Sequence, residues 1–132
     1  MTRYLTLAEY FWLAEQVTST EAAVLVKAAG VELADSALHA PAAGFGDQDF
    51  YPDLVDKAAV LTCRLAWNHP LPDGNKRAAW AALVMFIDLN GGGWDPDPPD
   101  VGDAEAAMLA VAAHEVDEAW LAQWLRDRVR FE

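Results

Sequence analysis

Ten consecutive residues near the middle of the chain, Ala78 to Ile87, are all apolar. The run is rich in Ala, Leu and Met, which favour helix, and it is too short to cross a membrane. A helix that is apolar on every side is typically buried on every side. We therefore predict a central helix over residues 77–89, closed by Asn90-Gly91, around which the rest of the chain packs.

Helical periodicity extends over most of the remaining sequence. Thr6 and Glu9 form a capping-box pattern, which predicts a helix that begins there and continues to about Val17. Apolar residues at helical spacing, bounded by capping or helix-breaking residues, predict further helices over residues 20–30, 32–38, 52–68, 103–113 and 117–129. The chain is therefore predicted to be all-α, with six or seven helices.

Two segments interrupt the helical pattern. Residues 41–51 carry two Gly around Phe45 and then acidic residues, which is typical of an exposed loop or a short hairpin. Residues 91–100 are rich in Gly, Pro and Asp and predict a loop, in which Trp94 either makes an exposed contact or covers the core. The length fits a single domain over residues 1–132, with at most one small hairpin near residue 45.

The balance of charge limits the kinds of partner. Nine Lys and Arg residues against 21 Asp and Glu give a formal net charge of −12. Such a surface disfavours direct binding to nucleic acid or to an anionic membrane, because both require cations to displace counterions. Cys63 is the only cysteine, so an internal disulfide and a cysteine-based zinc cluster are excluded. No signal-peptide pattern is present, and we expect a cytoplasmic protein.

The loop over residues 69–76 and the start of the following helix concentrate polar chemistry. Gly74 lets the backbone turn and lets a ligand approach closely. Asn75, Lys76 and Arg77 follow at the amino end of the predicted helix, where free N–H groups and a partial positive charge favour an anion. This arrangement indicates a phosphate-binding site.

Two further side chains of the loop complete a group-transfer site. Histidine is the side chain whose unperturbed pKa lies near neutrality, so His69 is the natural general base. Asp73 could hold Mg²⁺, which prefers carboxylate, water and phosphate oxygens. Together these residues describe a site that transfers a phosphate-containing group to a hydroxyl.

The segment from His69 to Arg77 resembles the signature of the Fic/Doc family, His-x-Phe-x-(Asp/Glu)-(Gly/Ala)-Asn-(Gly/Lys)-Arg. The departure is Leu71, where the family usually has Phe, and we expect Leu71 to anchor the loop in the core. Similarity to the Doc (death-on-curing) toxin branch extends to Tyr4-Leu5-Thr6-Leu7, Tyr51-Pro52, Asn90-Gly91 and Trp124-Leu125. The resemblance implies a Fic-like helical bundle with a small flap.

Two positions suggest which group is transferred. Family members that transfer AMP usually have Gly in place of Lys76 and a second Arg in place of Trp80. In Doc-like members, the change at these positions accompanies transfer of the γ-phosphoryl group of ATP. The resemblance therefore implies a toxin of a toxin–antitoxin pair that uses ATP and Mg²⁺ to phosphorylate a Ser or Thr hydroxyl of a protein, such as a translation elongation factor.

The resemblance also assigns roles within the site. It implies His69 as the base that accepts the proton of the target hydroxyl, Asp73 as the Mg²⁺ ligand, and a phosphate-binding set of Gly74, Asn75, Lys76 and Arg77. The flap that pairs with the backbone of the target by strand addition maps to Gly44, Phe45 and Gly46.

The sequence leaves open how the activity is inhibited and which reaction the chain catalyses. Many family members carry a self-inhibiting helix that contains Glu followed by Gly or Asn, and this chain has no such pair. A separate antitoxin is therefore expected to supply an inhibitory helix in a groove beside the motif.

The alternatives to a Doc-like kinase are a protein nucleotidyltransferase and a degenerate member that binds a partner without catalysis. Lys57 and Arg64 could assist phosphate binding, although solvated or structural roles are favoured.

Overall fold

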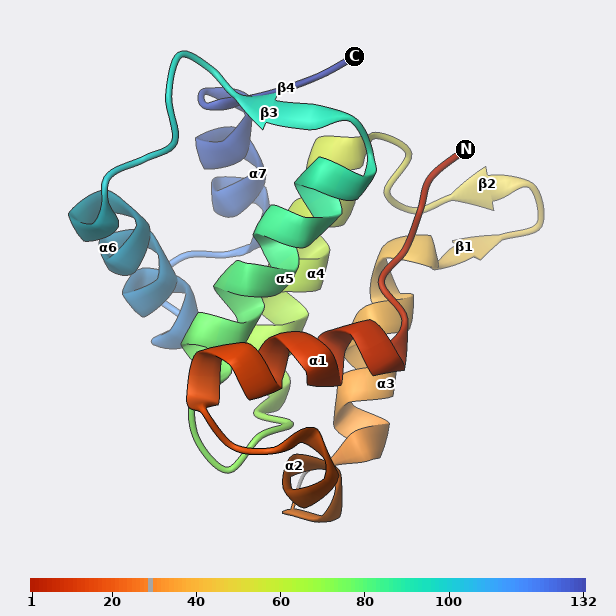
Figure 1. Cartoon of the computed structure of the whole chain (residues 1–132). Coiled ribbons are helices and arrows are strands. Elements are labelled where there is room, and N and C mark those ends of the chain that lie inside the picture. The colour runs from red at the N-terminus through yellow and green to blue at the C-terminus, as the bar shows by residue number, and fades with distance from the viewer. Residues whose placement is uncertain (29) are drawn as a thin grey trace.

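The computed structural model describes residues 1–28 and 30–132. Within these residues, the chain forms seven α-helices and two small two-stranded sheets (Figure 1). The helices are α1 (Leu7–Thr18), α2 (Ala22–Ala28), α3 (Val31–His39), α4 (Leu54–Asn68), α5 (Asn75–Leu89), α6 (Val101–Ala112) and α7 (Glu118–Arg126). The predicted all-α fold of six or seven helices is confirmed. The second predicted helix would include residue 29, which lies outside the described residues.

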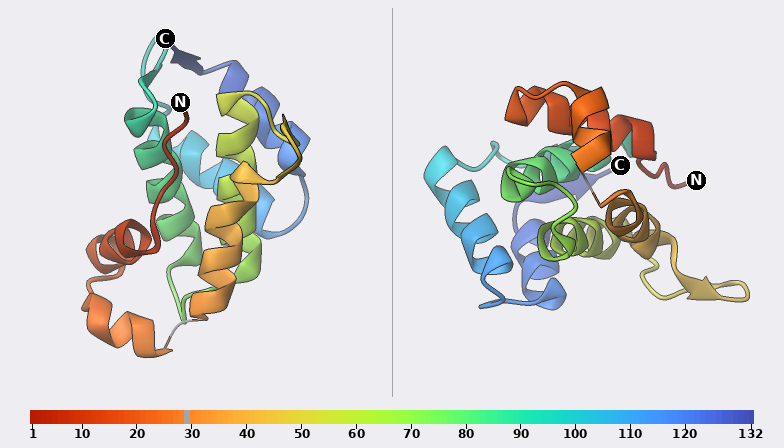
Figure 2. Two further views of the ribbon diagram at one scale, coloured as in Figure 1. Left: turned by 90° about the vertical axis from the view of Figure 1, so that its right-hand side faces the viewer. Right: turned by 90° about the horizontal axis from the view of Figure 1, so that it is seen from below.

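Helices α4 and α5 lie antiparallel at the centre of the molecule, with the other helices around them (Figures 1 and 2). Helix α1 packs against α5, and helices α3 and α7 pack against α4. The largest fully buried apolar side chains of the central pair are Leu61, Leu65, Leu83, Phe86 and Ile87. Each such side chain contributes about 1.5–3 kcal/mol to folding, so this pair of helices forms the centre of the core.

Helix α5 is central, but the prediction that it is buried on every side is wrong. Ala78 and Leu83 are fully buried, whereas Trp80 and Ala81 are only partly buried and Val84 is 37% exposed. One side of this apolar helix is therefore open, because no other element of the described residues covers it completely. Among the helices of residues 1–28 and 30–132, none combines the length and apolar character that a membrane span requires.

The two small sheets differ in how well the sequence predicts them. The strands β1 (Gly44–Phe45) and β2 (Gln48–Asp49) form the antiparallel hairpin expected near residue 45. A second antiparallel pair, β3 (Gly92–Trp94) with β4 (Val129–Phe131), includes residues from the start of the predicted loop over 91–100 and the last residue of the predicted helix over 117–129. The pairing opposes Trp94 to Val129 and so fixes the Trp94 backbone beside α7.

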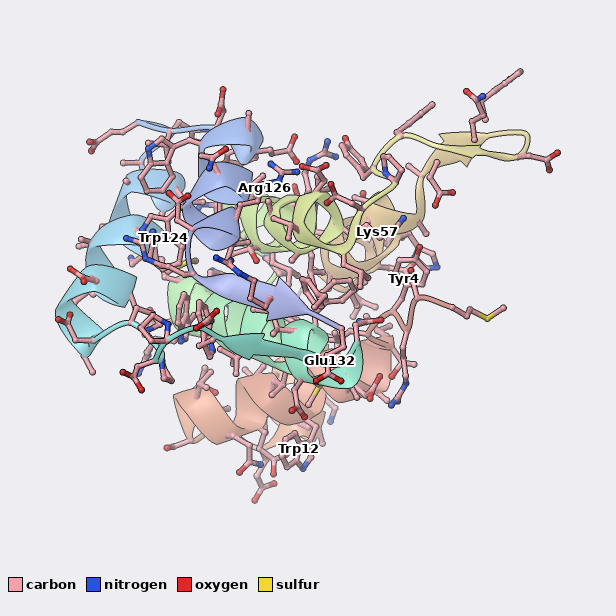
Figure 3. All side chains as sticks on the ribbon, turned by 90° about the horizontal axis from the view of Figure 1, so that it is seen from above. Tyr4, Trp12, Lys57, Trp124, Arg126 and Glu132 are labelled. Atoms are coloured by element: carbon pink, nitrogen blue, oxygen red, sulfur yellow. The ribbon has the colours of Figure 1, made fainter. Side chains whose placement is uncertain are left out.

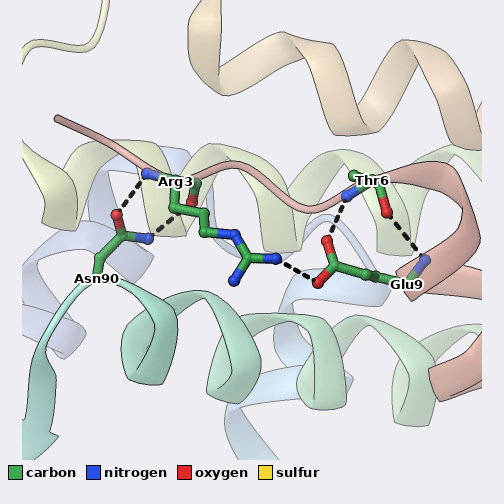
Figure 4. Close-up of polar contacts among 4 residues, drawn as sticks. All are labelled: Arg3, Thr6, Glu9 and Asn90. Carbon is green, nitrogen blue, oxygen red and sulfur yellow. Dashed lines mark hydrogen bonds and ion pairs between the residues drawn. The ribbon is translucent and has the colours of Figure 1, made fainter.

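A polar contact fastens the amino-terminal segment to the carboxyl end of α5 (Figure 4). The Asn90 side chain accepts a hydrogen bond from the Arg3 N–H at 2.7 Å and donates one to the Arg3 carbonyl at 2.9 Å. The predicted capping box is also present: Thr6 accepts from the Glu9 N–H, and the Glu9 carboxylate accepts from the Thr6 N–H. These contacts fix the direction in which α1 leaves the amino-terminal segment.

Lys57 has a structural role at the foot of the β1–β2 hairpin (Figure 3). Its side chain is 1% exposed, and its ammonium donates hydrogen bonds at 3.1 Å to the Pro41 carbonyl and to the Asp49 carboxylate. Burial alone would lower the pKa of Lys57, but its interactions with Tyr4 and with the Asp49 carboxylate outweigh burial, and the pKa is raised. Lys57 therefore stays charged and ties the hairpin to α4, and the structural role favoured from the sequence is confirmed.

Candidate active site

The loop that carries the motif connects the end of α4 to the start of α5. Helix α4 ends at Asn68, and His69 follows in a left-handed conformation with φ 50° and ψ 55°. Gly74, at φ 81°, is the N-cap of α5, which begins at Asn75. The loop is therefore bounded by two left-handed residues, and its polar side chains lie beside the amino end of the central helix.

Leu71 and Asn75 hold the loop in shape. Leu71 is 4% exposed and belongs to the hydrophobic core, so its predicted anchoring role is confirmed. The Asn75 side chain accepts from the Leu71 N–H and donates to the Leu71 carbonyl, both at 2.9 Å. The Asn75 amide thus closes the loop on itself. In this structure it positions the backbone of the loop, and only its second N–H remains for a phosphate.

Gly74 leaves the first turn of α5 open. It supplies no side-chain hydrogen bond to the helix, so the free N–H groups of the first turn remain available to an anion. A Cβ at this position would lie 2.8 Å from the Thr18 methyl group and 3.4 Å from an Arg77 guanidinium nitrogen. Together with the positive φ, this crowding requires glycine.

The two cations of the motif carry no acidic partner, although acids outnumber bases by 21 to 9. Five other basic residues pair with carboxylates: Arg3, Lys57, Arg64, Arg126 and Arg130. Lys76 and Arg77 are exposed and form no ion pair or side-chain hydrogen bond with the described residues. Their charge adds to that of the helix terminus, which makes this end of α5 suited to a multiply charged anion.

The remaining site residues fit a magnesium-assisted reaction. His69 and Asp73 are exposed on the loop and form no ion pair within the described part of the chain. No group of three or more His, Cys, Asp or Glu residues is gathered for a metal in residues 1–28 and 30–132. A single carboxylate still fits Mg²⁺, because this ion is usually held by one or two carboxylates together with phosphates and water.

The segment before α3 touches the motif loop, which the sequence did not indicate. The Gly30 N–H donates to the Pro70 carbonyl at 2.8 Å, and the Asn68 amide donates to the Leu33 carbonyl at 3.0 Å. Lys27, in the last turn of α2, is three residues before Gly30 and pairs with no carboxylate of the described residues. Gly30 and the first turn of α3 therefore border the motif loop on this side.

The β1–β2 hairpin does not border the site, and the flap predicted at Gly44, Phe45 and Gly46 is misplaced. The hairpin precedes the amino end of α4, whereas the motif follows its carboxyl end (Figure 1). The 15 residues of α4 separate the two by about 22 Å at 1.5 Å per residue. Phe45 is 84% exposed at the tip of the hairpin. The residues form the predicted hairpin, but a direct contact with a hydroxyl bound at His69 is not available to them.

A furrow begins at the amino end of α5, where the motif ends, and runs along the open side of this helix. It consists of two concave regions of about 1100 and 600 Å³. The two regions share Trp80, Ala81, Val84 and Trp94, so they adjoin each other. Lys76 and Arg77 line the larger region, and Asp88 lines the smaller one. We call this surface the α5 furrow. Its other walls come from α1, from α6 and from residues 98–101, and are formed mainly by Leu13, Val17, Pro98, Pro99, Val101, Met108 and Leu109.

The left-handed conformation of His69 predicts a measurable effect on stability. A residue with a Cβ in this conformation costs about 1 kcal/mol relative to glycine. His69→Gly should therefore raise the free energy of unfolding by about this amount in urea denaturation. His69→Ala should leave it nearly unchanged, because alanine carries the same cost. A loss of stability in His69→Gly would show that the imidazole makes a stabilising contact.

Comparisons with known proteins show the family to which the chain belongs. Residues 4–87, which contain α1 to α5 and the whole motif, match the model of the Fic/DOC family, so the chain belongs to that family. It is 47% identical over 85 residues to the toxin Doc of Mycolicibacterium smegmatis. That match covers 64% of this chain and 65% of the relative, so the chain spans slightly less than two thirds of the relative's length. The predicted family and its Doc branch are confirmed.

Proposed function

We propose that this chain is a Doc-like toxin that transfers the γ-phosphoryl group of ATP to a Ser or Thr hydroxyl of a protein. The observation that supports the proposal is the pair of exposed, unpaired cations, Lys76 and Arg77, at the amino end of α5 in a chain of net charge −12. Two adjacent cations beside the free N–H groups of a helix terminus favour the binding of a multiply charged anion.

Each residue of the site has a separate role in the proposed phosphoryl transfer. His69 accepts the proton of the attacking hydroxyl as general base. Lys76, Arg77 and the free N–H groups after Gly74 bind the phosphate oxygens and stabilise the charge that develops during transfer. Asp73 holds Mg²⁺, which supplies further neutralisation of the phosphates when bound. Asn75 keeps the loop backbone in the shape that these contacts require.

The choice of phosphoryl over nucleotidyl transfer rests on two residues. Lys76 and Trp80 stand where AMP-transferring members of the family have Gly and a second Arg. Trp80 supplies no charge, and it lies against Trp94 with ring centroids 5.7 Å apart. The space next to Arg77 that would hold a second cation is therefore filled by an aromatic wall.

A protein partner is proposed to control the activity. The relative named toxin Doc suggests that this chain too is one half of a toxin–antitoxin pair. We propose a cognate antitoxin whose helix covers the surface next to the motif. The proposed target is a protein of translation, such as an elongation factor, because that is the substrate class implied by the Doc resemblance.

Growth of bacterial cells tests the proposal as a whole. Induced expression of the wild-type chain should stop growth and protein synthesis, measured by incorporation of a labelled amino acid. His69→Ala should be tolerated at equal expression. His114→Ala is the matched control, because His114 is also exposed and left-handed, with φ 56°, but lies outside the motif. Equal toxicity of the wild type and His69→Ala would contradict the proposal.

A further inference from the structure

The residues on both sides of His69 are tied to the start of α3. The Asn68 side-chain amide donates a hydrogen bond to the Leu33 carbonyl at 3.0 Å. The Gly30 N–H donates to the Pro70 carbonyl at 2.8 Å. Leu33 lies in the first turn of α3, and Gly30 is the N-cap of that helix. We call these two hydrogen bonds the α3 anchor. They join the end of α4 to the start of α3, which lies beside it (Figures 1 and 2).

The position of the His69 imidazole depends on its backbone. In many active sites a carboxylate orients the catalytic histidine. The exposed His69 side chain pairs with no carboxylate of residues 1–28 and 30–132. Its left-handed conformation, with φ 50° and ψ 55°, costs free energy and persists where the surrounding contacts hold it. The α3 anchor supplies such contacts one residue before His69 and one residue after it.

The two halves of the motif loop are held by separate contacts. Asn75 closes the later half through its two hydrogen bonds to Leu71, and this half leads into the first turn of α5 and the proposed phosphate site. The α3 anchor holds the earlier half, which carries His69. Loss of the anchor should therefore affect the base and leave the phosphate site intact.

We infer that Asn68 is a positioning residue that, together with the Gly30 N–H, holds the backbone of His69 where the imidazole reaches the target hydroxyl. Rests of this kind matter because a general base must lie within about 2.6–3.2 Å of the group whose proton it accepts. A displacement of about 1 Å can lower the rate about 10²-fold. This inference rests on the proposed function and adds to it a residue that precedes the motif.

Removing the Asn68 amide should lower kcat and leave the phosphate site unchanged. For Asn68→Ala, kcat with the purified target should fall between about 10- and 10²-fold. The KM for ATP should stay within about twofold of the wild-type value. Calorimetry with inorganic tripolyphosphate, which probes the phosphate site alone, should show the same affinity as the wild type. Asn68→Leu is a second, nearly isosteric variant. Ala and Leu both favour helix, so the end of α4 should fold in each.

A double-mutant cycle tests whether Asn68 acts through His69. If it does, the double variant Asn68→Ala/His69→Ala should transfer the phosphoryl group as slowly as His69→Ala alone, because the base is already absent. If the two losses instead multiply, Asn68 supports another part of the molecule and the inference is overturned.

Asn90→Ala is the matched control. The Asn90 side-chain amide also donates to backbone carbonyls, those of Arg3 and Phe86 at 2.9 and 2.8 Å, but at the opposite end of α5. Its loss should lower the melting temperature and leave kcat unchanged at a temperature where all the variants are folded. An equal fall of kcat in Asn90→Ala and Asn68→Ala would show that reduced stability alone slows transfer, and would overturn the positioning role.

Hydrogen exchange gives a readout that does not depend on activity. The Gly30 amide should exchange about tenfold faster in Asn68→Ala than in the wild type, because half of the α3 anchor is lost, and should be unchanged in Asn90→Ala. Unchanged exchange in Asn68→Ala, with an active wild type, would overturn the anchor and leave the proposed function standing. A wild type that transfers no phosphoryl group would overturn the proposed function and the role of Asn68 together.

Discussion

Replacing His69 by Ala is expected to lower the rate of phosphoryl transfer by about 10²–10⁴-fold, the usual contribution of a general base. The imidazole lies on the exposed surface of the motif loop and forms no ion pair with the described residues, so its removal takes away a chemical function and little structure. The rate should be measured with the purified target and ATP, and the fold checked by thermal unfolding.

The control for this prediction is His114→Ala, which removes an imidazole of similar conformation and exposure. His114 lies outside the motif in the sequence, and its ring stacks on that of Trp67, in the last turn of α4, with ring centroids 4.8 Å apart. Its loss should leave the rate unchanged. A His69→Ala protein that keeps its melting temperature and more than a tenth of the wild-type rate would show that another group accepts the proton.

Replacing Arg77 by Gln is expected to have an effect of similar size. Arginines that stabilise charge during phosphoryl transfer contribute about 10³–10⁵ to the rate constant. Arg77 is unpaired in the described structure, so Arg77→Gln leaves no carboxylate without its partner and should not destabilise the fold. The rate should fall about 10³-fold, and calorimetry should show weaker binding of tripolyphosphate.

Arg3→Gln is the matched control, because Arg3 is an exposed arginine that pairs with Glu9 at 2.9 Å at the far end of α5 (Figure 4). Its loss should change neither the rate nor the binding of tripolyphosphate. Equal effects of Arg3→Gln and Arg77→Gln would mean that only the total charge of the chain matters. The specific role of the first turn of α5 would then be wrong.

Much of the fold follows from local patterns. The capping residues Thr6 and Asp117 and the apolar run after Arg77 predict α1, α7 and α5 to within a few residues, because each signal acts within one helix. The sheet of β3 and β4 was not predicted, since it joins segments about 35 residues apart, and the short Gly-rich β3 has no alternation of its own. A pairing of this kind depends on tertiary contacts.

The residue types of the site could be predicted from the sequence, but their arrangement in space could not. The sequence places His69, Asp73, Lys76 and Arg77 in one loop and the start of the helix after it, since all of them lie within nine residues. It did not show the clamp of Asn75 on Leu71 or the open side of α5, which depend on the path of the loop and on the placement of α6. The flap was misplaced for the same reason: a hairpin can be predicted locally, but its distance from the motif is set by the length and direction of α4.

The most direct test of the proposed reaction follows the two labels of ATP. The purified chain is incubated with bacterial lysate, Mg²⁺ and ATP labelled at either the γ- or the α-phosphate, with His69→Ala in parallel. We expect a protein that is labelled from the γ-phosphate only and is absent with His69→Ala, and mass spectrometry would then identify it. A protein labelled from the α-phosphate would contradict the account and show that the chain is a nucleotidyltransferase despite Lys76 and Trp80.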